Sequence, residues 1–573
     1  ADVRRPTQAP LAPSQHHPQQ NRTPVTQYRY AKGGITQKHR RPQCECRVFT
    51  SSFCRDGVMA TGSFSAAQGD VACTAQVIDL GKISKIASGV PFLDHMIDQL
   101  TSHAQLGVYV QVTLNGAHLV TDRDYAQNGE APASTRARLD ASSNNDRPYD
   151  ATIIRVCGEA LGGALAALFT VVHDTSNNQG LPVCRGIRFV APLDEAISEV
   201  EIGPIQLATP PRADAMGELT YSQAPFGRFP ATGRKWVGSL RLELLGDFWH
   251  AVQRQLGRSL SVLKLRGDNA HHIVESSFKA FARVLRASLD VTAAKRVPNV
   301  QPSLASEPLR TAQKARVTKE TDINVRLALD DKGTSQLASG LQTLDSMLGA
   351  LCLASGLSVT AECRGDLFVD DHHSTEDVCI AFGQCLHEAL GNKAGCNRMA
   401  CATATEGSAH VEVIMDLSNR PYFEHNLGLV EEMVRSPELF FAIAHATLKQ
   451  NHSPLSRGCV RSMHVGRNLL LRGCGCAAPN LAREVFRPLC RALLSPQVGD
   501  VSAEMIIHAL DSLCTSARMT VHVRQLAIGS DVGSSYELVM ATGRALGLAF
   551  RQCAAIDPRR AGMVTSSKGT LSV

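Results

Sequence analysis

Two short segments of this 573-residue chain have residue types and a spacing suited to metal chemistry. His372–Glu376 and His271–Glu275 both read His-His-x-x-Glu. Positions three and four apart lie on one face of an α-helix, so each segment would present imidazole and carboxylate side chains together. Nitrogen and carboxylate donors of this kind bind divalent metal ions. The two segments therefore predict a dinuclear metal site.

The sequence around both segments has the periodicity of elements that could position such a site. Apolar residues recur at helical spacing over Glu376–Leu390, and His271–Leu289 has the same character. Three other segments predict strands: Thr321–Leu329, Leu357–Cys363 and Ala409–Leu417. We expect a mixed α and β protein whose helices carry the histidines.

The chain contains two copies of one pattern, offset by about 250 residues. Ala87–Met96 matches Ala338–Met347, and Gly158–Leu161 matches Gly383–Leu386. We predict a disordered leader (1–45), copy 1 (46–290), a proline-containing linker (291–315) and copy 2 (316–573). Loop-like insertions are expected at 117–145 and 204–235 in copy 1 and at about 430–497 in copy 2.

The copies keep different histidines. Copy 1 has His95 where copy 2 has Ser346, and copy 2 has His522 where copy 1 has Ser261. The His-His-x-x-Glu segments also lack counterparts. Copy 2 has Val532, Gly533 and Tyr536 at the positions of the first segment, and copy 1 has Arg147, Pro148 and Ala151 at those of the second. Each copy has thus lost the candidate ligands that the other retains.

Composition excludes several classes of protein. The formal charge of +6 is small for this length and no basic-aromatic motif is present, so we expect no nucleic-acid partner. The longest apolar run, Ala160–Val172, is too short to span a bilayer and predicts a buried helix, so we expect no membrane partner. The 18 cysteines are scattered without a Cys-x-x-Cys pair, which indicates reduced thiols in an intracellular protein.

The leader is rich in Pro, Gln and Arg. It is interpreted as the remnant of an organelle-targeting segment or as a tail without an address. We accordingly expect a cytoplasmic protein, or one of the stroma of a plastid or other organelle if the leader is such a remnant.

Five motifs together resemble the imidazoleglycerol-phosphate dehydratase family, the manganese lyases of histidine biosynthesis. They are Phe92–Met96, Asp371–Asp377, Asp416–Pro421, His271–Ala280 and Ser566–Gly569. A member of that family carries the set in one shorter domain, whereas this chain spreads it over two copies. The resemblance implies an α+β fold in which each copy has two similar halves, each with a four-stranded sheet and two helices. It also implies a large symmetric homo-oligomer with active sites between subunits.

By this resemblance the two copies would share one composite site with two manganese ions, and the opposite junction would be empty. The expected ligands are His95, His271, His272 and Glu275 of copy 1 and His372, His373, Glu376 and His522 of copy 2.

The reaction implied is dehydration of imidazole glycerol phosphate to imidazole acetol phosphate. Metal ions that hold the ring as imidazolate would stabilise the charge that develops. The resemblance makes Glu320 the carboxylate that moves the proton. It assigns the substrate phosphate to Arg398, Arg420, Ser566 and Lys568.

Two alternatives remain open from the sequence. The insertions and the degenerate copy 1 are also consistent with a non-catalytic structural subunit derived from this enzyme. A different lyase or hydrolase on the same scaffold is disfavoured by the intact ring-binding and phosphate-binding sets.

Overall fold

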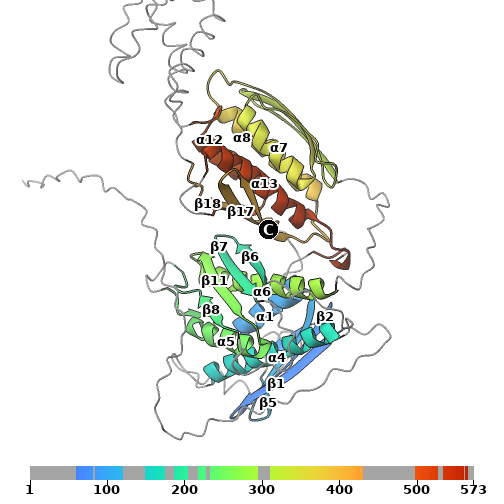
Figure 1. The fold of residues 1–573 in the computed structure, drawn as a ribbon, viewed down its shortest axis with the longest axis vertical. Coiled ribbons are helices and arrows are strands. Elements are labelled where there is room, and N and C mark those ends of the chain that lie inside the picture. The colour runs from blue at the N-terminus through green and yellow to red at the C-terminus, as the bar shows by residue number, and fades with distance from the viewer. Residues whose placement is uncertain are drawn as a thin grey trace, which may run out of the picture.

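The computed structural model describes residues 60–81, 84–119, 149–174, 186–203, 217–227, 233–293, 310–429, 497–526, 533–560 and 562–564. Four sheets with packed helices follow one another along these residues (Figure 1). The predicted α+β class, with two similar halves in each of two copies, is confirmed. The leader, residues 294–309 of the linker and residues 430–496 of the insertion lie outside the described residues, whereas the linker's first three residues end α6 and its last five lie in β12.

The first half of copy 1 is a sheet of strand order β1-β2-β4-β3, extended by the short strand β5 beside β4. Strand β3 runs parallel to β4 and the other pairs are antiparallel. Helices α1 and α4 pack on this sheet. The bounds are β1 Thr61–Gln68, β2 Val71–Asp79, β3 Lys85–Ala87, α1 Pro91–Ala104, β4 Leu106–Leu114, β5 Ala117–His118 and α4 Asp150–Asp174.

The second half of copy 1 has the sheet order β6-β7-β11-β8, with helices α5 and α6. Strand β8 lies inside the segment 204–235 that the sequence predicted as a loop. That prediction is wrong for these four residues, which pair in parallel with β11. The bounds are β6 Ile187–Leu193, β7 Ala196–Ile202, β8 Leu219–Ser222, β9 Trp236–Val237, β10 Leu240–Arg241, η1 Leu242–Leu244, α5 Leu245–Leu256, β11 Leu260–Arg266 and α6 Ala270–Ala293.

Copy 2 repeats both halves, with sheets β12-β13-β15-β14 and β16-β17-β21-β18. The predicted strands and helices around residues 321–329, 357–363, 376–390 and 409–417 are all confirmed, with small shifts at their ends. The bounds are β12 Thr311–Val317, β13 Thr321–Ala328, β14 Ser335–Ala338, α7 Gln342–Ser355, β15 Ser358–Gly365, α8 His372–Leu390, β16 Met399–Glu406, β17 Ala409–Asp416, β18 Tyr422–His425, β19 Gln497–Val498, β20 Val501–Ser502, α12 Ala503–Ser516, β21 Thr520–Gln525, α13 Ser535–Ala554 and η3 Pro558–Arg560.

Equivalent positions in the two copies can be read from the structure. Helices α1 and α7 both have 14 residues, which places His95 and Ser346 at the same turn. In the second halves, His522 pairs with Ile414, the sixth residue of β17, and Ser261 pairs with Glu201, the sixth residue of β7. The structure thus agrees with the sequence in aligning His522 with Ser261.

Each copy has its own hydrophobic core, built between its helices and sheets. Helix α4, in copy 1, is long and apolar enough to cross a membrane by length and composition, but its apolar window is 72% buried in the protein. It packs closely on α5, because a Cβ atom at Gly158 would lie 2.6 Å from the carbonyl oxygen of Phe248. This burial agrees with the predicted core helix.

The second halves of the two copies meet at one junction (Figure 1). Val190 and Ile197 of copy 1 pack against Ile414 of copy 2. Beside them the guanidinium of Arg188 lies 2.6 Å from the buried carboxylate of Glu412. At the other end, Arg560 in η3 donates to the carbonyl oxygen of Ser102, 2.9 Å away at the end of α1. The copies are therefore docked by both apolar and charged contacts.

Candidate metal centres

Copy 1 brings three of its predicted ligands together. Helix α1 supplies His95, and helix α6 supplies His271 and Glu275 one turn apart. The Nε2 atoms of His95 and His271 lie 3.5 and 2.9 Å from the same oxygen, Oε2 of Glu275. Two imidazoles and a carboxylate converging in this way form a donor set that fits a divalent cation.

The carboxylate of Glu275 has a second partner on the next turn of α6. Lys279 Nζ lies 2.8 Å from Glu275 Oε1, and both side chains are largely buried. Burial opposes ionisation, but the charge of Lys279 and the hydrogen bonds from His271 and His95 hold the pKa of Glu275 well below its usual range. This carboxylate is therefore ionised whenever the protein is folded near neutral pH.

Copy 2 has a second group with the same chemistry, and one member was not predicted. His372 and Glu376 begin α8, and His508 comes from α12. The Nε2 atoms of His372 and His508 lie 3.4 Å from the two oxygens of Glu376. His508 is a single histidine among apolar residues of a helix, with no neighbouring motif, so the sequence carried no signal for it.

Predicted ligands from both copies come together at the tight turn between β6 and β7, which consists of Asp194 and Glu195. His272 of copy 1 shares a hydrogen bond with Glu195 Oε2 at 2.8 Å, and His522 Nε2 of copy 2 lies 2.8 Å from the carbonyl oxygen of Asp194. Burial lowers the pKa of His522 to about 4, so its imidazole is neutral at physiological pH.

The remaining predicted residues of copy 2 lie near one another at the start of α8. His373 Nδ1 lies 3.0 Å from Asp366 Oδ2, and this hydrogen bond raises the pKa of His373. The charge of Glu320, an exposed residue between β12 and β13, raises it further. Within the part of the chain that the structure describes, neither metal-capable group combines ligands of both copies.

Comparison with known proteins places these groups in a family context. The family model of imidazoleglycerol-phosphate dehydratase matches residues 137–285 and 339–450. Imidazoleglycerol-phosphate dehydratase 1, chloroplastic, of Arabidopsis thaliana is 30% identical over 301 residues, which make up 52% of this chain and 86% of that protein. This chain belongs to the imidazoleglycerol-phosphate dehydratase family. The split of the match into two regions suggests duplicated halves.

Other relatives match a similar share of the chain. The imidazoleglycerol-phosphate dehydratase of Gloeobacter violaceus is 30% identical over 262 residues, 46% of this chain and 98% of that protein. The crystal structure of imidazoleglycerol-phosphate dehydratase from Staphylococcus aureus is 21% identical, with a TM-score of 0.29, over 43% of this chain and 99% of that chain.

The candidate phosphate-binding residues of this family member already have anionic partners. Arg398 is buried and donates to both oxygens of Asp416, at 2.7 and 2.9 Å. The guanidinium of Arg420 lies 2.9 Å from Asp194 Oδ1, on the same turn that contacts His272 and His522. Ser566 and Lys568 lie outside the described residues. Arg420 is thus placed beside candidate ligands of both copies.

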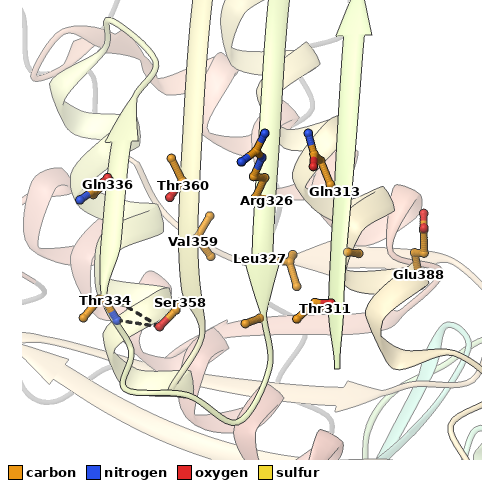
Figure 2. Close-up of a pocket in the computed structure, with 12 residues that line it drawn as sticks. Thr311, Gln313, Arg326, Leu327, Thr334, Gln336, Ser358, Val359, Thr360 and Glu388 are labelled. Atoms are coloured by element: carbon orange, nitrogen blue, oxygen red, sulfur yellow. Dashed lines mark hydrogen bonds between the residues drawn. The ribbon is translucent and has the colours of Figure 1, made fainter. Parts of the chain in front are cut away.

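The described part of the protein has two surface hollows that could be compared with the metal-capable groups. The larger is an open face of the sheet β12-β13-β15-β14, lined by both polar and apolar residues such as Gln313, Arg326 and Val359 (Figure 2). None of the candidate ligands lines it, so it is not the metal site. A hollow of about 580 Å³ lies directly beside His372 and His508.

Proposed function

We propose that this chain is a metal-dependent dehydratase that converts imidazole glycerol phosphate to imidazole acetol phosphate in histidine biosynthesis. The observation that carries the proposal is the complementary retention of ligands. Copy 1 keeps His95 and the first His-His-x-x-Glu segment, and copy 2 keeps His522 and the second. Two copies that had lost function would be expected to lose residues without such a division.

The composite site would be formed where complementary copies face one another. The turn at Asp194 and Glu195 supports this idea, because it gathers His272 of copy 1 and His522 and Arg420 of copy 2. The eight expected ligands include those gathered around Glu275 and those gathered around Glu376. Within one chain these are two separate groups. We therefore propose that a neighbouring chain of a homo-oligomer completes the pocket, with two manganese ions per composite site.

In this proposal manganese ions held by the histidine and glutamate ligands would supply Lewis-acid chemistry to the imidazole ring of the substrate. Proton transfer and phosphate binding would be carried out by residues of the chain. Glu320, which is exposed and near His373, would accept the proton from the carbon beside the ring and deliver a proton to the departing hydroxyl. Arg420, together with Arg398, Ser566 and Lys568, would fix the phosphate, so that the reacting carbon lies near the carboxylate.

A dehydratase assay on manganese-loaded protein tests the proposal. Wild type should be active, and His272→Ala and His373→Ala should each be inactive, because each removes a ligand contributed by only one copy. An equimolar mixture of the two variants should regain part of the activity if chains share sites. A wild-type chain that is folded and manganese-loaded but inactive on imidazole glycerol phosphate would overturn the proposal.

A non-catalytic structural subunit is the second candidate, and one observation favours it. Both described arginines of the phosphate set are paired with carboxylates, Arg398 with Asp416 and Arg420 with Asp194. If these pairs serve only docking and folding, Asp194→Asn should leave substrate binding unchanged. If Arg420 binds phosphate, Asp194→Asn should instead lower KM, because it frees the guanidinium from a competing anion.

The location of the protein is proposed from its relatives. Several of them are named as chloroplastic, including the Arabidopsis thaliana protein. We propose that residues 1–45 are the remnant of a targeting segment and that the protein works in a plastid stroma. Fractionation of the source cells should recover the native protein in the plastid stroma, whereas recovery in the cytoplasm would contradict the proposal.

A further inference from the structure

We infer that copy 2 holds a divalent cation by itself, through His372, Glu376 and His508, with His508 as a ligand of its own. This inference deepens the proposed function, and it rests on that function for the choice of manganese as the ion. It differs from the composite site because all three donors lie in copy 2. It also gives a role to a residue outside both His-His-x-x-Glu segments.

The donor atoms converge on one point. Each imidazole offers its Nε2 atom to a different oxygen of Glu376, at 3.4 Å in both cases. The Nε2 atom of His508 is buried and makes no hydrogen bond in the described part of the protein. A buried nitrogen that lacks a hydrogen bond and faces a carboxylate is a costly arrangement without a ligand. A cation between the three side chains would satisfy it.

The helices that carry the donors are fixed against each other at their first turns. Asp371, at the start of α8, accepts a hydrogen bond from the backbone N–H of Ser502 at 2.6 Å. Ser502 is also the N-cap of α12, since its side chain accepts from the N–H of Met505. His508 therefore stands at a defined distance from His372, as a ligand on a rigid element should.

The surroundings favour a cation over an anion. The hollow beside the group is lined by the carboxylates of Glu424, Glu504 and Asp511, together with His425. These side chains would repel a phosphate and attract a positive charge. The open side of the ion would thus face water or a neutral ligand such as an imidazole.

Copy 1 lacks this third ligand on the matching helix. Leu240 begins β10 in copy 1, and Val501 begins β20 at the same place in copy 2. His508 lies seven residues after Val501, and Asp247 lies seven residues after Leu240, so Asp247 is the counterpart of His508. Asp247 is exposed and belongs to neither metal-capable group of the described residues. In copy 1 the corresponding group takes its second histidine, His95, from α1 instead.

A purely structural role for His508 has to be separated from ligation. Its ring lies 5.3 Å from that of His372, centroid to centroid, which is a stacking distance. The substitution His508→Phe keeps the ring and removes the nitrogen, and His508→Gln serves as a second variant of different shape. The matched control is His250→Phe, which changes an exposed histidine of α5 that belongs to neither group.

The experiment is a titration of the metal-free full chain with Mn²⁺ alone, with free Mn²⁺ measured by electron paramagnetic resonance. Wild type and His250→Phe should bind two ions per chain. His508→Phe and His508→Gln should keep one ion at unchanged affinity and bind the other at least about tenfold more weakly, since even supporting residues of a metal site are worth that much. His372→Phe should weaken the same ion, and His95→Phe the other one.

The outcomes separate this inference from the proposed function. If both His508 variants bind two ions with wild-type affinity, the inference is overturned, whatever the dehydratase activity. If they lose one ion while the wild type is inactive as a dehydratase, the inference stands and the proposed function fails. Thermal unfolding of the metal-free variants serves as the folding check, and their midpoints should match that of the wild type.

Discussion

The two metal-capable groups use the same residue types but differ in their electrostatic setting. In copy 1, Glu275 is largely buried and paired with the buried ammonium of Lys279. In copy 2, the side chain of Glu376 is 33% exposed, and its ion-pair partners among the described residues are both histidines. The carboxylate of Glu275 is therefore held by an ammonium group of the protein itself, whereas that of Glu376 has only imidazole partners among the described residues.

The largest expected effect separates the two carboxylates directly. Glu275→Gln should lower the free energy of unfolding by about 3–5 kcal/mol, because it leaves the charge of Lys279 buried without its partner. Glu376→Gln should stay within about 0.5 kcal/mol in metal-free protein. Urea unfolding of both variants measures this difference. The double variant Glu275→Gln/Lys279→Met should recover most of the loss, and failure to do so would show that the ion pair is not the cause.

Metal addition should stabilise each copy through its own group. Mn²⁺ at about 100 times the dissociation constant should raise the free energy of unfolding by about 2.7 kcal/mol for each site that binds only the folded state. His95→Phe should remove the contribution of copy 1 and leave that of copy 2. Chelation with EDTA should reverse the gain in both. If His95→Phe abolished the whole stabilisation by Mn²⁺, the two groups would form one shared site and not two.

A pH dependence is expected from copy 1 at a position where copy 2 has no titratable group. His103 is fully buried, and burial, followed by the charges of Lys279 and Arg398, lowers its pKa well below 6.5. The equivalent residue in α7 is Ala354. As pH falls below about 6.5, the unfolded chain takes up a proton that the folded chain does not, so stability should fall by about 1.4 kcal/mol per pH unit.

The check is the pH slope of urea midpoints between pH 7 and 5 for wild type and His103→Gln. The variant should lose the part of the slope that this one proton contributes. An unchanged slope would mean that His103 is not the group responsible.

The smallest expected effect concerns the charged contact between the copies. Asp194→Asn removes the ion pair with Arg420, whose side chain is 35% exposed, and should cost about 0–1 kcal/mol. The carbonyl oxygen of Asp194 would still contact His522. The matched comparison is Asp416→Asn, which leaves Arg398 buried without its carboxylate and should cost about 3 kcal/mol or more. Similar losses for the two variants would contradict the difference in burial.

Much of the fold was predictable because its helices and strands have strong periodicity. Apolar periodicity predicted a helix over Glu376–Leu390, and α8 spans His372–Leu390, so that it includes the His-His-x-x-Glu segment that the sequence also placed on a helix. Strand β8 was missed, since Leu219–Ser222 has four residues and its hydrogen bonds come from β11, about 40 residues later. A short strand of this kind is defined by its partner and not by its own pattern.

The candidate site was predictable where motifs carried it and not where tertiary contacts did. The two His-His-x-x-Glu segments were found, and His95 joins the first as a ligand candidate. The sequence did not find His508, which meets His372 only through the packing of α12 on α8. It also did not find the turn of Asp194 and Glu195, which gathers residues of both copies through the docking of the second halves.

The contact of Arg560 with the end of α1 joins residues that are 458 positions apart. A ribosome adds about 5–20 residues per second, so this contact becomes possible roughly 20–90 s after Ser102 has been synthesised. Ile414 lies 224 positions after Val190, so for roughly 11–45 s of synthesis the apolar residues Val190 and Ile197 have no Ile414 to cover them. During translation this apolar surface of copy 1 can therefore associate with other chains. The charge of Arg188, at the rim of the surface, is well placed to limit such aggregation.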